Sequence, residues 1–158
     1  MTPESTGIRI ALPSKGRLAS EALDLFSSAG IPIFKPNPRQ YQASIPNLPE
    51  VTVIFQRASD IVTSVRDGSV EFGITGWDIY SENKAENGNL LVLLENLRFG
   101  TCTLNVIIPE NWQTIQTFND LADWQKSVGR PIRVATKFPW LTEQFFKKNT
   151  VFTRFLFL

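Results

Sequence analysis

The chain has 158 residues, 42% of them hydrophobic and 20% charged, so it is long enough to bury one sizeable core or two small ones and too apolar to be a disordered chain. Its 16 Lys and Arg residues nearly balance its 15 Asp and Glu residues. This balance excludes an overall positive electrostatic field that would favour binding to nucleic acid or a membrane surface. Histidine is absent, which excludes Ser-His and Cys-His nucleophile pairs and histidine metal sites.

Apolar runs at the start of the chain alternate with helical patterns. The runs at 8–12, 41–45, 51–55, 70–74 and 90–94 predict strands, the second and third of them neighbours joined by a proline-containing turn. Apolar residues at helical spacing predict three helices. These are expected over 18–29 before Gly30, from a cap at Ser59 or Asp60 to Gly68, and over 77–85.

The pattern restarts after Gly100. Alternating apolar residues predict a strand over 102–108, followed by a helix over 118–124, a strand over 132–136 and a helix that begins at Pro139. The single cysteine, Cys102, precludes an internal disulfide, and we expect it in the core rather than as a nucleophile. The phenylalanine-rich last eight residues predict a final apolar strand.

Strands that alternate with helices predict an α/β fold with largely parallel sheets and right-handed crossovers. The restart near residue 100 predicts two domains, 1–100 and 101–158. The N-terminal segment lacks a basic start and a long apolar run, and no stretch approaches the ~20 apolar residues of a membrane-spanning helix. We therefore expect a cytoplasmic protein that binds neither membranes nor nucleic acid.

A basic glycine turn follows the first predicted strand. The free amides and the positive end of a helix favour phosphate, Gly16 allows close approach of the backbone, and Lys15 and Arg17 add cationic donors. The turn fits neither the Walker pattern nor the dinucleotide fingerprint, and an ordinary solvated turn is the alternative.

Three further turns carry polar residues after predicted strands. Gly76 and Asp78 form a turn that a planar or anionic ligand could approach, with a plain helix cap as the alternative. Arg57 and Asp60 could pair with phosphate or only with each other, and Lys137 could reach a ligand or lie on the surface. Open α/β sheets bind ligands at the edge where their strands end, so these residues are jointly candidates for one site.

Five ordered segments resemble the ATP phosphoribosyltransferase family, which carries out the first step of histidine biosynthesis. They are RIALPSKGRL at 9–18, FQRASDI at 55–61, GITGWD at 73–78, RFGTC at 98–102 and RVATKFP at 133–139. The resemblance covers roughly residues 7–148. Many family members have Leu-Pro-Lys-Gly-Arg in the first segment, whereas Ser14 precedes the lysine here.

The resemblance implies a two-lobed fold of the type II periplasmic-binding-protein kind with an incomplete second lobe. It also implies a pentosyltransferase that joins ATP to 5-phosphoribosyl 1-pyrophosphate and releases pyrophosphate, with Mg²⁺ carried by the substrates. It names no catalytic side chain and no metal ligand. The substrate-binding residues that it implies are Lys15, Gly16 and Arg17 at the phosphates, Arg57 and Asp60 beside them, Gly76 and Asp78 near a base or ribose, and Lys137 from the second lobe.

The sequence departs from the family beyond about residue 149, and the family's Asp-Leu-Val-Ser-Thr-Gly phosphate loop is not found. We therefore expect this chain alone to transfer phosphoribosyl groups poorly or not at all, and to form a homo-oligomer or a complex with a regulatory subunit. Two alternatives are a non-catalytic ligand-binding module of the periplasmic-receptor type, which the lack of an export signal disfavours, and a subunit that keeps the nucleotide site but relies on another chain for catalysis.

Overall fold

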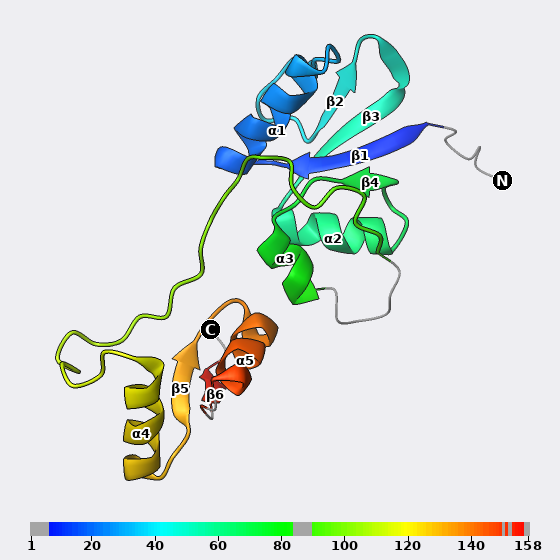
Figure 1. The fold of residues 1–158 in the computed structure, drawn as a ribbon. Helices are drawn as coiled ribbons and strands as arrows, with labels where there is room; N and C mark the ends of the chain where they lie inside the picture. The colour runs from blue at the N-terminus through cyan, green and yellow to red at the C-terminus, as the bar shows by residue number, and fades with distance from the viewer. Residues whose placement is uncertain (1–6, 84–89, 150, 152, 157–158) are drawn as a thin grey trace. The chain divides into compact units, whose positions relative to one another are not determined.

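The structure, a computed structural model, describes residues 7–83, 90–149, 151 and 153–156. The chain divides into two compact units, the first ending at Thr101 and the second beginning at Cys102 (Figure 1). No helix among the described residues is both long enough and apolar enough to span a bilayer.

A four-stranded sheet forms the centre of the first unit. Its strands are β1 (Ile8–Pro13), β2 (Gln42–Ile45), β3 (Leu48–Gln56) and β4 (Phe72–Gly73), in the order β2-β3-β1-β4. The central strand β1 is parallel to both β3 and β4, whereas β2 pairs antiparallel with β3, its predicted neighbour. The mostly parallel sheet confirms the predicted α/β class.

Helices cover both faces of this sheet (Figure 1). They are α1 (Arg17–Ser28) and α2 (Ala58–Arg66), and a third helix, α3 (Trp77–Asn83), packs against α2. Side chains alternate across a strand, so Ile10 and Leu12 of β1 pack with Phe26 of α1, while Ala11 packs with Ile61 of α2 on the other face. Burial on both faces explains why the part of β1 from Ile10 to Pro13 is continuously apolar rather than alternating.

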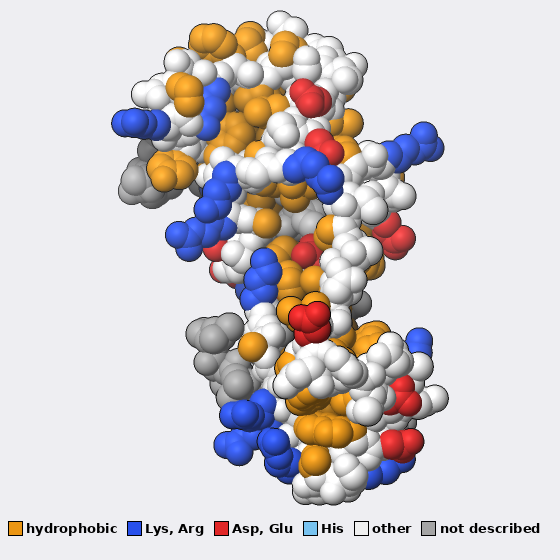
Figure 2. Space-filling model, turned by 90° about the vertical axis from the view of Figure 1, so that its left-hand side faces the viewer, with side chains coloured by type: hydrophobic (Ala, Val, Ile, Leu, Met, Phe, Trp, Pro, Cys, Tyr) orange, Lys and Arg blue, Asp and Glu red, His pale blue; other side chains and the backbone are white. Residues whose placement is uncertain are grey.

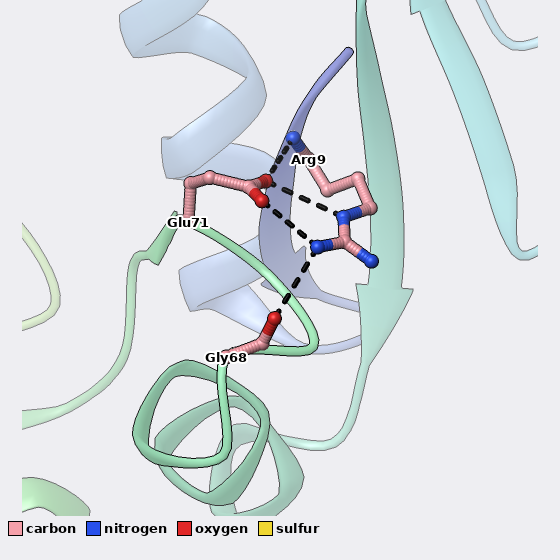
Figure 3. A network of polar contacts seen from close by, with 3 residues as sticks. All are labelled: Arg9, Gly68 and Glu71. Carbon is pink, nitrogen blue, oxygen red and sulfur yellow. Dashed lines mark hydrogen bonds and ion pairs between the residues drawn. The ribbon is translucent and has the colours of Figure 1, made fainter. Parts of the chain in front are cut away.

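A polar cluster joins the start of β1 to the chain that leads into β4 (Figure 3). The Arg9 guanidinium donates to the Glu71 carboxylate at 2.8 Å and to the Gly68 carbonyl at 3.2 Å, and the Arg9 main-chain N–H donates to the same carboxylate. The two residues lie far apart in the sequence, so the cluster fixes the edge of the sheet through a tertiary contact.

The second unit contains α4 (Phe118–Val128), β5 (Ile132–Ala135), α5 (Pro139–Lys148) and β6 (Thr153–Leu156). Strands β5 and β6 pair in parallel, which confirms a strand at 153–156 within the predicted C-terminal segment. A small core holds them to the helices, and the Trp112 and Trp124 rings lie 4.5 Å apart in it. Those two tryptophans are packing residues. The buried members of this core are Ile115, Leu121, Phe146 and Val151.

Two predicted strands are wrong. Residues 90–94 and 102–108 form no strand in the structure, and their apolar side chains are largely exposed, with Leu91 at 82% and Ile107 at 89%. An apolar pattern becomes a strand only where a neighbouring strand supplies hydrogen bonds, and no described strand pairs with either segment. For the same reason Cys102 is exposed rather than in the core.

Smaller corrections concern element ends. Arg57, not Ser59 or Asp60, is the N-cap of α2, and both of the predicted caps lie inside its first turn. The strand expected over 70–74 shortens to the two residues of β4. The helix predicted over 77–85 runs to Asn83, and the rest of that prediction lies outside the described residues.

Candidate functional site

The turns that follow β1, β3 and β4 lie at one edge of the first unit's sheet. Pro13 at the end of β1 lies opposite Gln56 at the end of β3, and the Ser14 N–H donates to the Gln56 carbonyl at 2.8 Å. On the other side of β1, the Ile74 N–H just beyond β4 donates to the Ala11 carbonyl at 3.0 Å. Because the three strands are parallel, their carboxyl ends and the turns after them share this edge.

Two helices begin at this edge on opposite faces of the sheet. The chain leaving β1 enters α1, and the chain leaving the adjacent β3 enters α2. In an open α/β sheet, a crevice for ligands forms where neighbouring strands send their connections to opposite faces. The ends of β1 and β3 are such a point, and the predicted residues 15–17 and 57 follow them directly.

The N-terminus of α1 is suited to an anion. Gly16 is its N-cap with φ 81°, a left-handed conformation that glycine adopts without strain, and no side chain caps the helix. Its first turn contains no acidic residue that would offset the positive end of the helix dipole. Lys15 is exposed beside it and forms no ion pair with any residue that the structure describes.

The N-terminus of α2 differs in its charge. Its N-cap Arg57 is exposed, makes no side-chain cap and has no salt-bridge partner in the described part of the chain. Asp60 lies in the first turn, where its carboxylate accepts from the Ser59 hydroxyl at 3.1 Å and offsets the helix dipole. The turn at α1 is therefore the stronger anion site of the two.

Arg17 has a second set of contacts that the sequence did not reveal. Its Nη2 donates to the Thr101 carbonyl at 2.7 Å, and its Nε lies 3.8 Å from a Glu21 carboxylate oxygen. Its side chain is still 66% exposed. The i,i+4 spacing of Arg17 and Glu21 on one helix was the signal that could have found this pair.

Gly76 and Asp78 lie at the third turn of the same edge. A Cβ on Gly76 would collide with an Asp78 carboxylate oxygen, so the Asp78 side chain lies against the turn and would have to move to admit a side chain at position 76. The neighbouring Thr75 hydroxyl donates to the Ala58 carbonyl at 2.9 Å, which joins this turn to the start of α2. The contact was not predicted from sequence.

Lys137 lies in the second unit, in the turn between β5 and α5. It is exposed, and its Nζ lies 5.1 Å from the centre of the Phe138 ring. The first unit thus brings seven of the eight predicted residues to one edge of its sheet, and Lys137 is not among them. Over the face drawn in Figure 2, Lys and Arg side chains occur as separate groups rather than as one continuous patch.

A metal site made by the protein is not formed by these residues. Within the described ranges, no three His, Cys, Asp or Glu side chains are grouped so that they could hold a metal ion. Of the candidate residues at the edge, only Asp60 and Asp78 are carboxylates.

Comparisons with known proteins agree on one family. The family model described as "HisG: ATP phosphoribosyltransferase" matches residues 57–158. The chain is 40% identical over 153 residues to ATP phosphoribosyltransferase 1, chloroplastic, of Arabidopsis thaliana. The aligned region covers 94% of this chain and 37% of that protein. It is 38% identical over 147 residues to ATP phosphoribosyltransferase of Mesorhizobium japonicum, with 90% and 63% covered.

A solved structure supports the fold. The chain is similar to a chain of the ATP phosphoribosyl transferase (HisG:HisZ) complex from Thermotoga maritima, with a TM-score of 0.53 and 17% identity over 96% of this chain and 64% of that one. The likeness confirms the predicted α/β fold of the periplasmic-binding-protein kind. The chain spans less than two thirds of the length of each of these three proteins.

Proposed function

This chain belongs to the ATP phosphoribosyltransferase family, and on that premise we propose that it is part of an enzyme that joins ATP to 5-phosphoribosyl 1-pyrophosphate in the first step of histidine biosynthesis. The observation that carries the proposal is the sheet edge of the first unit. There, the N-terminus of α1, whose N-cap is Gly16 and which has no side-chain cap, is accompanied by the exposed cations Lys15 and Arg57. Phosphate groups are the ligands that such a site favours.

We assign the substrate phosphates to the turn of Lys15, Gly16 and Arg17. The first amides of α1 have no intrahelical partners and no side-chain cap, and Gly16 lets an oxygen approach the backbone. Lys15 supplies a mobile point charge, whereas the planar guanidinium of Arg17 supplies directed donors. Positive charge at this position would stabilise the pyrophosphate that departs as the new bond forms.

The neighbouring turns would hold the rest of the nucleotide. Arg57 would add a second guanidinium at the phosphates, and Asp60 would lie beside them in the first turn of α2. The Asp78 carboxylate, which lies against Gly76 in the third turn, would accept hydrogen bonds from a ribose hydroxyl or the adenine amine.

The reaction suits a site without histidine. Adenine N1 carries its own lone pair, so its attack on the anomeric carbon needs no protein base, and the work of the protein is to position both substrates and to stabilise charge. Mg²⁺ would supply further charge neutralisation. Since only Asp60 and Asp78 among the candidate residues carry carboxylates, the substrate phosphates would provide most of its ligands.

The remaining assignments extend the proposal beyond the first unit. Residues 1–100 would form the first lobe of the catalytic domain and 101–158 a partial second lobe, from which Lys137 would contribute a cation. The functional assembly would be a homo-oligomer or a complex with a regulatory subunit, since the similar Thermotoga maritima protein was solved as a HisG:HisZ complex. We place it in the cytoplasm, while the Arabidopsis relative is named chloroplastic.

Calorimetric titration of the full 158-residue chain tests the proposal. We expect ATP and inorganic pyrophosphate to bind in the presence of Mg²⁺, and little phosphoribosyl transfer in a turnover assay. Binding of an amino acid without binding of ATP would favour the receptor alternative. Turnover equal to that of a longer relative would contradict the expectation that this part of the enzyme is inactive alone.

A further inference from the structure

The chain leaves the first unit through a turn with two left-handed residues. Arg98 has φ 63° and is the one non-glycine residue with positive φ in the described part of the chain, and Gly100 has φ 69°. The Asn96 side-chain oxygen accepts from the Arg98 N–H at 2.7 Å, which stabilises the first of these conformations. A turn that holds two residues at positive φ has a defined backbone conformation, unlike a flexible linker.

This exit turn, residues 96–101, packs against the first turn of α1. A Cβ on Gly100 would lie only 3.0 Å from Leu18 Cδ1, so the backbone approaches the helix closely. One residue further on, the Thr101 carbonyl accepts from Arg17 Nη2 at 2.7 Å. The exit turn is thus held by a residue of the proposed phosphate-binding turn.

Glu21 completes the arrangement from the next turn of α1. Its Oε1 lies 3.8 Å from Arg17 Nε, and its Oε2 is buried with no hydrogen-bond partner among the described residues. A nearby positive charge stabilises a carboxylate oxygen that has no hydrogen-bond partner. Glu21 therefore stabilises the conformation in which the Arg17 guanidinium lies beside it. Glu21 and Thr101 together fix one edge of the Arg17 guanidinium.

The other edge of that guanidinium is available to a ligand. Arginine has five N–H donors in a fixed plane. Of these, only Nη2 donates a hydrogen bond to a described residue, at 2.7 Å, while 66% of the side chain is exposed. A guanidinium can therefore hold the Thr101 carbonyl and a phosphate oxygen at the same time. Lysine cannot do this in the same geometry, because its ammonium is a single point on a flexible stem.

We propose that Arg17 couples phosphate binding at the turn of residues 15–17 to the docking of the exit turn, with Glu21 as the positioning residue that orients Arg17. This inference rests on the proposed function. Occupation of the turn by a phosphate rigidifies the chain where it leaves the first unit. Because coupling between two sites is reciprocal, loosening the exit turn weakens phosphate binding by the same factor.

Hydrogen exchange of the full chain with inorganic pyrophosphate as the probe tests the coupling. In the unaltered chain, saturating pyrophosphate should slow amide exchange at residues 98–101 by about fivefold or more, the lower end of typical couplings. The Arg17→Lys variant keeps the charge and should still bind pyrophosphate, but without that added protection. If Arg17 only held the exit turn in place, amide protection at residues 98–101 would be the same with and without pyrophosphate.

The Glu21→Gln variant is a second test of the coupling. It should weaken pyrophosphate binding about two- to fivefold, the size of an exposed ion pair, because one side of the Arg17 guanidinium is no longer held. The matched control is Glu143→Gln, which alters another i,i+4 ion pair, with Lys147, in the second unit and should leave the affinity unchanged. Pyrophosphate binding without slower exchange at 98–101 would overturn the coupling and leave the proposed function intact, whereas no binding at all would overturn both.

Discussion

The Glu71 carboxylate and the Arg9 guanidinium form an ion pair at 2.8 Å that ties the start of β1 to the residue just before β4 (Figure 3). Strand β4 has only two residues, so few ladder hydrogen bonds hold it at the edge of the sheet. The pair supplies the missing restraint. It therefore stabilises the strand from which the turn of Gly76 and Asp78 departs.

Stability should depend on pH through this pair. Hydrogen bonds from the side chain and main chain of Arg9 lower the pKa of Glu71 from 4.5 to about 2. Because the folded-state pKa lies below the unfolded value, the contribution is fully present above about pH 4.5 and is lost as the pH falls towards 2. Glu71→Gln should lower the melting temperature at pH 7 but not at pH 2.

The control for that experiment is Glu50→Gln. Glu50 is an exposed residue of β3 without an ion pair in the described part of the chain, so its removal should change the melting temperature little at either pH. A loss in Glu71→Gln that persists unchanged to pH 2 would show that the pair acts through packing rather than through charge.

Lys15→Gln and Arg57→Gln should each weaken pyrophosphate binding about tenfold or more, the size of one charge-assisted hydrogen bond. Each should also reduce the dependence of affinity on salt, because one fewer cation contacts the anion. The measurement is calorimetric titration at two salt concentrations. Lys148→Gln, an exposed lysine of the second unit, is the matched control, and an equal effect there would mean that the binding is non-specific.

The capping box at the start of α4 should contribute to the stability of the second unit. The Thr117 hydroxyl accepts from the Asp120 N–H at 3.2 Å, and the Asp120 carboxylate accepts from the Thr117 N–H at 2.7 Å. Thr117→Ala should cost about 1 kcal/mol in chemical denaturation. Thr117→Ser retains the hydroxyl and should cost much less, so equal losses in the two variants would contradict a role for the cap.

Gly73→Ala should destabilise the first unit. The added Cβ would lie 2.5 Å from Ile61 Cγ2 and 3.0 Å from the Ala11 carbonyl oxygen, so β4, α2 or both must shift. Overpacking of this kind typically costs about 1–3 kcal/mol. In a double-mutant cycle with Ile61→Ala, the combined cost should be smaller than the sum, and strict additivity would show that the two side chains do not clash.

Ile107→Lys should leave the free energy of unfolding within about 0.5 kcal/mol, because the side chain is 89% exposed. It should also raise solubility by removing one of several exposed apolar side chains. Leu12→Ala, at a fully buried position of β1, should instead cost about 2–5 kcal/mol. A similar loss in both variants, by chemical denaturation, would show that residue 107 is packed in solution.

Local pattern predicted several elements correctly. The apolar run of β1, the helical spacing of α1 with Gly30 after it and the proline at the start of α5 each encode an element within about twelve residues, and all three are present. The strand predicted at residues 102–108 is absent. Alternating apolar residues show which side chains a strand would bury, but they do not show whether a partner strand exists.

By itself, the sequence determined the α/β class, the family and the set of basic and glycine-containing turns that follow the strands. Only the tertiary structure decided that β1 lies between β3 and β4, which brings the turns after all three strands to one edge. It also decided that Arg17 contacts Thr101, 84 positions away. Propensity and periodicity act over a few residues, whereas these relationships depend on which strands pair and which backbone atoms meet once the chain has folded.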